Sequence, residues 1–178
     1  MDGISELSGF SAQHADLADR LGPMVEQRLQ RIRRMHFTLG GAVERGNGAV
    51  ELTFERKNPI MLAVGADGES LRIVDGAWVD PFAPPLSDEN EQWIATHGKW
   101  DVFDASEEPE YSGIVGGSLS AFWSLKTRVD RLCGVRLHFT NGTLDVVCNG
   151  DEVFVYLPND LKLAREYVYV GGRFPRAQ

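Results

Sequence analysis

The stretches Val50-Glu51-Leu52-Thr53-Phe54 and Val135-Arg136-Leu137-His138-Phe139 share the pattern V-x-L-x-F and lie 85 positions apart. Alternation of apolar and polar residues is typical of a strand with one buried face. The same offset places Phe37 over Phe122. These observations predict two similar β units within one chain.

Further strand-like runs follow each pentapeptide and extend the repeat. The second unit has a shorter connection after its first strand. The matching segments are Ile60 to Val64 with Leu144 to Cys148, the turn signals Asp67-Gly68 with Asn149-Gly150, and Leu71-Arg72-Ile73 with Val153-Phe154-Val155.

Turn residues divide both units into antiparallel strands. In the second unit, we expect Asn141-Gly142 to close a two-residue hairpin, which sets Thr140 opposite Thr143 and Val135 opposite Cys148. A last strand is expected near Tyr167 to Val170. The strands expected in the first unit are His36 to Val43, Ala49 to Arg56, Pro59 to Val64 and Ser70 to Val74.

Helical periodicity is confined to the N-terminal region, where Val25, Leu29 and Ile32 recur at i, i+4 and i+7. Gly22-Pro23 divides this region, because proline is tolerated in a first helical turn and not in an interior. We therefore expect one helix from Ala12 to Leu21 and a second from Pro23 to about Arg34. On the second helix, Arg28, Arg31, Arg34 and the neighbouring Arg33 would form a solvated face; the acidity of the chain argues against nucleic-acid binding.

The negative charge of the chain is concentrated between its two predicted units. From Asp80 to Glu110 there are nine acidic residues and one basic residue, Lys99, an excess that equals the whole net charge of −8. Ser87 is expected to cap a short helix that runs through Ile94. Aromatic residues are interspersed among the carboxylates, and disordered segments are poor in aromatics. The segment is therefore predicted to be an ordered acidic insertion, or one that orders on a partner.

Such a segment has the composition of a protein-binding surface. Tryptophan and tyrosine supply contact area, and carboxylates steer a basic partner. The alternative is a loop whose aromatic side chains only cover the sheet edges. The residues predicted to bind a partner are Asp88, Glu89, Glu91, Trp93, Trp100, Asp101, Phe103, Asp104, Glu107, Glu108, Glu110 and Tyr111.

The sequence contains no coherent catalytic or metal-binding motif. Cys133 and Cys148 lack zinc-ligand spacing and are interpreted as reduced, buried residues. Ser118 follows Gly116-Gly117, but it matches neither a nucleophile elbow nor a phosphate loop. The acidic pairs Asp88/Glu89 and Glu107/Glu108 are adjacent and do not face each other as glycosidase carboxylates do. The four histidines, His14, His36, His97 and His138, are scattered. No cofactor and no metal are expected.

The predicted fold class is α+β, with N-terminal helices packed on antiparallel sheet made of the two units. We expect one compact domain over 1–178, whose parts are a helical N-terminus (1–34), the first β unit (35–79), the acidic insertion (80–120), and the second β unit with a C-terminal strand (121–172). The sequence does not indicate whether the units form one sheet or two.

The predicted function is non-catalytic protein binding. The concrete hypothesis is a cytoplasmic inhibitor of the immunity-protein type, which covers the basic active site of a toxin or nuclease. No nucleic acid is expected as a partner, and no membrane, because no run approaches the ~20 apolar residues of a spanning helix. Two alternatives stay open: a small-ligand-binding or regulatory module with a pocket between the β units, and an unrecognised hydrolase.

Overall fold

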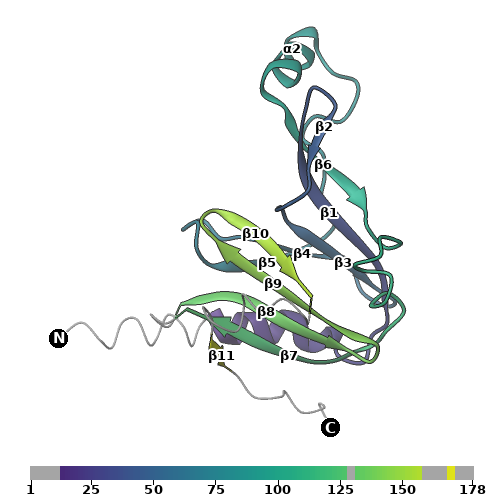
Figure 1. The fold of residues 1–178 in the computed structure, drawn as a ribbon, viewed down its shortest axis with the longest axis vertical. Helices are drawn as coiled ribbons and strands as arrows, with labels where there is room; N and C mark the ends of the chain where they lie inside the picture. The colour runs from purple at the N-terminus through teal and green to yellow at the C-terminus, as the bar shows by residue number, and fades with distance from the viewer. Residues whose placement is uncertain (1–12, 128–130, 158–167, 171–178) are drawn as a thin grey trace, which may run out of the picture.

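The computed structural model describes residues 13–127, 131–157 and 168–170. It has an α+β fold with two short helices and two antiparallel sheets (Figure 1). A helix over residues 13–21 comes first, so the predicted N-terminal helix is confirmed in the described part, and Ala12 lies outside it. The other elements are η1 (Gly22–Met24), β1 (Leu29–Leu39), β2 (Ala42–Glu44), β3 (Val50–Phe54), β4 (Ile60–Val64), β5 (Leu71–Asp75), α2 (Asp88–His97), β6 (Lys99–Asp104), β7 (Leu119–Lys126), β8 (Leu132–Phe139), β9 (Gly142–Asn149), β10 (Glu152–Tyr156) and β11 (Val168–Val170).

The first sheet has the order β2-β1-β3-β4-β5. Strands β2 and β3 pair with different parts of the same edge of β1, and β6 pairs with its opposite edge. The second sheet has the order β10-β9-β8-β7-β11, so the expected last strand forms over Val168–Val170. All the pairings are antiparallel. The two predicted β units thus contribute to separate sheets.

The pairing registers of the two sheets agree downstream of the V-x-L-x-F strands and differ upstream of them. Strand β3 pairs with β4 in the same register as β8 pairs with β9, and β4 pairs with β5 in the same register as β9 pairs with β10. Upstream, Leu52 lies opposite Ile32 while Leu137 lies opposite Phe122. The expected equivalence of Phe37 with Phe122 is therefore wrong in register, and the internal repeat itself stays a prediction.

The second predicted helix, Pro23 to Arg34, is wrong. The helix over residues 13–21 is followed by the short turn η1, Glu26 adopts a φ of 71°, and the chain then enters β1. A register shift between Leu29 and Arg31 lets Leu29 and Ile32, three residues apart, both face the core. This β-bulge produces the spacing that resembles a helical period.

Two strand boundaries also differ from the expectation. The predicted strand from His36 to Val43 is divided by Gly40 and Gly41, whose positive φ values of 57° and 83° turn β1 into β2. In the β8–β9 hairpin, Val135 pairs with Val146 and not with Cys148. Because this register error is two residues, the buried face of the hairpin was still predicted correctly.

One hydrophobic core lies between the two sheets and contains residues from both. Phe54 of β3 and Phe139 of β8 stack across it with their ring centroids 6.5 Å apart. The helix over residues 13–21 contributes Leu17 and Leu21 to the same core. Hydrophobic burial of these residues is the main favourable term that holds the sheets together.

Both cysteines are free and buried, and they lie on opposite faces of the second sheet. A second register shift leaves Cys133 as an extra residue of β8, because Leu125 pairs with Gly134 while Lys126 pairs with Leu132. Cys148 faces the main core. Desolvation raises the pKa of each thiol to about 12, which makes both poor nucleophiles.

Candidate partner-binding surface

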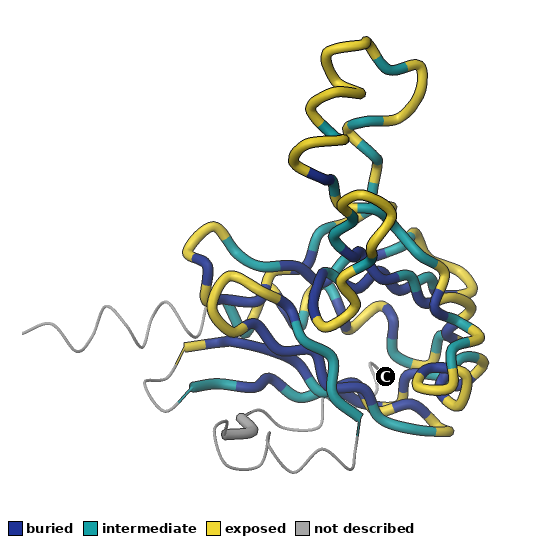
Figure 2. Tube along the Cα trace, turned by 45° about the horizontal axis from the view of Figure 1, so that its top comes forward, coloured by how far each residue is buried: buried dark blue, intermediate teal, exposed yellow. Residues whose placement is uncertain are grey.

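A protruding arm carries most of the predicted partner-binding residues. The arm consists of β2, β6, α2 and the part of β1 that pairs with β2 and β6 (Figure 1). Its tip, around α2, is largely exposed, in contrast to the buried strands of the body (Figure 2). The acidic segment is therefore folded onto the first sheet through β6.

Helix α2 forms for the local reason that its sequence indicates. Ser87 accepts a hydrogen bond from the Asn90 amide at 3.3 Å, which confirms the predicted cap. Asp88, Glu89 and Glu91 occupy the first turn, where the helix dipole favours carboxylates. No residue of α2 is buried, so these carboxylates face solvent.

Trp93 is held on the exposed side of α2 by two ring contacts. Phe82 stacks on it with a centroid distance of 5.3 Å, and His97 stacks at 4.9 Å. The residue is nevertheless 45% exposed. An ordered, half-exposed tryptophan is the kind of residue that forms an interface anchor.

Trp100 lies at the base of the arm, on the face of the first sheet that does not contact the main core. Its ring meets Phe37 edge-on at 5.9 Å, and 44% of the residue is exposed. Together with Met35, Met61 and Trp78, it lines a groove of about 420 Å³, which we call the tryptophan groove. Methionine and tryptophan provide an adaptable apolar floor for a partner side chain.

Gly48 lines this groove together with Val153 of β10. It adopts a φ of 117°, and a Cβ atom there would collide with the backbone of Met35. Its amide donates to the Val153 carbonyl at 2.8 Å and joins the first sheet to β10. This close approach needs glycine.

Several of the predicted partner-binding carboxylates already have partners within the protein. Asp101 accepts a hydrogen bond from Thr38 at 2.8 Å and forms an ion pair with Lys99 at 2.7 Å. Lys99 also contacts Asp80 at 2.9 Å, and these hydrogen bonds raise the pKa of Lys99. Glu108 forms an ion pair with Arg45, 3.0 Å away.

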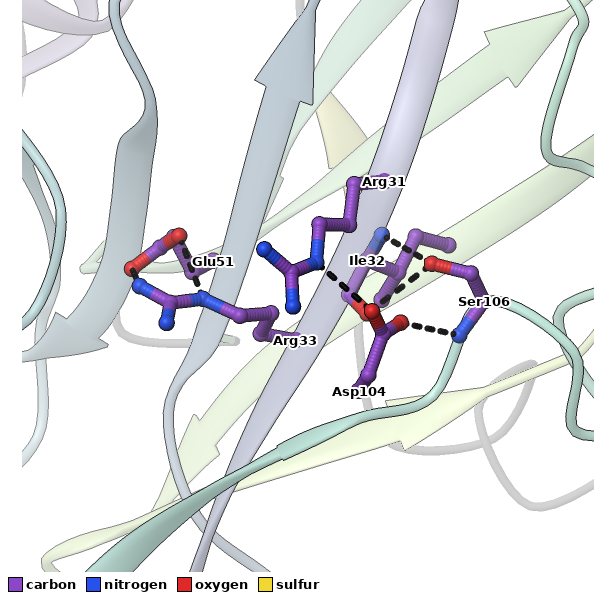
Figure 3. Close-up of polar contacts among 6 residues, drawn as sticks. All are labelled: Arg31, Ile32, Arg33, Glu51, Asp104 and Ser106. Atoms are coloured by element: carbon purple, nitrogen blue, oxygen red, sulfur yellow. Dashed lines mark hydrogen bonds and ion pairs between the residues drawn. The ribbon is translucent and has the colours of Figure 1, made fainter.

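The charged row of β1 lies on a strand, and its residues alternate between faces. Figure 3 shows Arg31 turned toward Asp104 and Arg33 turned toward Glu51. The first pair is half exposed, whereas Glu51 is only 2% exposed and receives two hydrogen bonds from Arg33 at 2.8 and 2.6 Å. The expectation of a wholly solvated arginine face is therefore wrong. Arg33 is paired with a buried carboxylate, and Arg34, which the strand period sends to the side opposite Arg33, is itself buried.

Asp104 also accepts hydrogen bonds from Ser106. Burial alone would raise the pKa of Asp104, but the contacts with Ser106 and Arg31 outweigh it, so the pKa is lowered. The carboxylate of Asp104 is therefore ionised, but it is already bound by Arg31 and Ser106 within the protein.

The carboxylates that stay available form two groups on the surface. Within the described residues, no ion pair involves Asp88, Glu89 or Glu91 of α2, or Glu107 and Glu110 beyond β6. All five residues are exposed. Their unpaired charge provides a negative field for a basic partner.

The remaining predicted aromatic residues are less accessible. Phe103 is partly buried beneath Arg45, whose guanidinium lies 5.6 Å from the ring centroid. Tyr111 is only 4% exposed and accepts a hydrogen bond from Arg34. No local sequence pattern indicates that Tyr111 lies inside the fold while Trp93 and Trp100 lie on its surface.

The candidate catalytic and metal-binding residues Ser118, His14, His36, His97 and His138 all lie in the described part of the chain. No cluster of three or more His, Cys, Asp or Glu residues with the geometry to hold a metal is found there. The Gly116 and Gly117 amides donate to the Leu29 and Ile114 carbonyls, so they do not form an open anion nest. The Ser118 amide donates to Thr140 at 3.1 Å, which is a structural connection.

Comparisons with protein families, with characterised proteins and with solved structures found no match to this chain.

Proposed function

We propose that this chain is a non-catalytic binding module whose arm docks on a basic surface of a protein partner. The observation that carries the proposal is the combination, on one protruding element, of ordered half-exposed Trp93 and Trp100 with exposed unpaired carboxylates. Tryptophan supplies binding area, and rim charges accelerate encounter. The tryptophan groove continues this surface at the base of the arm.

The concrete form of the proposal is a cytoplasmic inhibitor of the immunity-protein type. Such a protein neutralises a toxin or nuclease by covering its cationic active site, and a narrow acidic projection suits that geometry. No helix in the described residues is both long enough and apolar enough to span a membrane. The acidic segment is, in this proposal, an insertion between two copies of one β unit, supported by the common register of their later strands.

The proposal is tested by capturing partners on the immobilised full chain and measuring their binding kinetics at two ionic strengths. Reversal of Glu89 and Glu91 to lysine should slow association about tenfold or more at low salt, and the difference should shrink at high salt. Glu55→Lys is the control for charge reversal away from the arm, because Glu55 is also exposed but lies in the β3–β4 connection.

Trp93→Ala should instead speed dissociation of the partner. Thermal melts of the variant should match those of the unmodified protein, because the ring is half exposed and α2 contributes no buried residue to the core. A captured toxin or nuclease should lose activity in the complex. Equal kinetics for the Glu89/Glu91 variant and the Glu55 control would exclude the arm as the docking site.

A second candidate function is a small-ligand-binding or regulatory module with its pocket between the two β units. It is favoured by a cavity of about 510 Å³ that residues of β1, the β2–β3 connection and β10 line together. This volume is within the usual range for small-molecule sites.

A further inference from the structure

The cavity between the β units, which we call the arginine pocket, is lined by both polar and apolar residues. The polar ones include Arg34, Arg45, Glu110 and Tyr111. Val155 of β10 and Leu157, just beyond that strand, are apolar. The pocket lies on the opposite face of β1 from Met35 and the tryptophan groove.

Arg34 is a buried cation without an ion-pair partner among the described residues. It is 4% exposed, and in this part of the chain it donates only to the Tyr111 hydroxyl and to the Gly48 carbonyl, both neutral acceptors. Its Nε atom has no hydrogen-bond partner among the described residues. No carboxylate of the described residues hydrogen-bonds to it, although a buried charge normally requires an ionic partner. An anion in the adjoining pocket would supply the missing countercharge.

Tyr111 adds a second donor beside Arg34. Because its oxygen accepts from the guanidinium, its own proton can be donated to a ligand. Burial raises the pKa of Tyr111, and Arg34 offsets this effect only in part. The phenol therefore keeps its proton at neutral pH.

The charges around the pocket favour an anion of low charge. Arg45 is already paired with Glu108 at 3.0 Å, whereas Arg34 has no ion-pair partner among the described residues. The exposed Glu110 lines the same pocket and repels a doubly charged anion more strongly than a singly charged one. A singly charged carboxylate can compensate Arg34 and accept hydrogen bonds from its guanidinium.

We propose that the arginine pocket binds the carboxylate group of a small organic acid, with Arg34 and Tyr111 as donors and the organic part against Val155 and Leu157. The inference deepens the second candidate function. It is independent of the arm, so failure of the docking proposal would leave it intact.

The test uses the full chain and sodium benzoate, a monocarboxylate with an apolar ring, at constant ionic strength and pH 7. Binding is followed by NMR through the Nε–H signal of Arg34. Benzoate should give a saturable shift, benzamide of the same shape should give none, and inorganic phosphate should bind more weakly. Tyr111→Phe keeps the buried ring and should weaken benzoate binding about tenfold, the loss expected for one hydrogen bond to a charged acceptor.

Two control variants separate this site from general electrostatics. Arg72→Gln removes an exposed cation that lines the tryptophan groove, and reversal of Glu89 and Glu91 alters the arm; both should bind benzoate as the unmodified chain does. Absence of saturation, or equal affinity in the Tyr111→Phe variant, would overturn the proposal. Tighter binding of phosphate than of benzoate would overturn the assignment to a carboxylate.

Discussion

Truncation of Phe139 tests whether the two sheets share one core. Phe139 is 1% exposed and stacks on Phe54 of the other sheet, with the ring planes 21° apart. Phe139→Ala removes a buried aromatic ring, and such changes destabilise a protein by about 3 to 5 kcal/mol. That is a large share of the ~5 to 15 kcal/mol that stabilises a typical domain.

The neighbouring residue is the matched control. His138 is exposed, and its ring contacts Thr143 at 2.9 Å and the edge of Trp123. His138→Ala should therefore change the free energy of unfolding by less than about 1 kcal/mol. Urea melts of both variants, monitored by circular dichroism, measure the difference.

A double-mutant cycle examines the contact between the sheets directly. Phe54→Ala and Phe139→Ala should be non-additive, with a coupling of about 0.5 to 1.5 kcal/mol from the aromatic pair, in addition to shared cavity effects. Strict additivity would show that the two rings do not pack together in solution. A larger loss from His138→Ala than from Phe139→Ala would mean that β8 presents the opposite face to the core.

Three further predictions follow from buried ionisable groups. Arg33→Met should destabilise the protein by about 3 to 5 kcal/mol in denaturant melts, because it leaves the buried carboxylate of Glu51 without its ionic partner. Arg31→Met should cost less than about 1 kcal/mol, because its ion pair is half exposed. Equal losses from the two variants would refute the distinction. Cys133 and Cys148 should resist a thiol reagent until the protein unfolds, and rapid labelling of the native protein would contradict their burial. Because folding raises their pKa from 9.0 to about 12, the free energy of unfolding should fall as the pH rises through this interval. Burial lowers the pKa of His36 below 6.5, so the unfolded chain binds the proton more readily and stability should fall as the pH drops below that value; pH-dependent melts of His36→Asn should lack this contribution.

Much of the local structure could be predicted from neighbouring residues. The alternation in Val135 to Phe139 identified the buried face of β8, and Ser87 identified the start of α2. These features depend on short-range periodicity and on hydrogen bonds between residues three positions apart. The concentration of charge in the acidic segment was likewise visible, but its ion pairs with Arg31 and Arg45 were not, because these partners come from distant parts of the chain.

The sequence by itself determined the α+β class, the faces of most strands and the exposed acidic character of α2. Only the tertiary structure decided that residues 29–39 form a strand, because β3 on one edge and β6 on the other satisfy its backbone and a bulge restores Leu29 to the core. It likewise placed Arg34 beside Tyr111 and away from any carboxylate partner in the described chain. Such placements depend on pairing between segments far apart in sequence, and local residue patterns contain no record of which strands will meet.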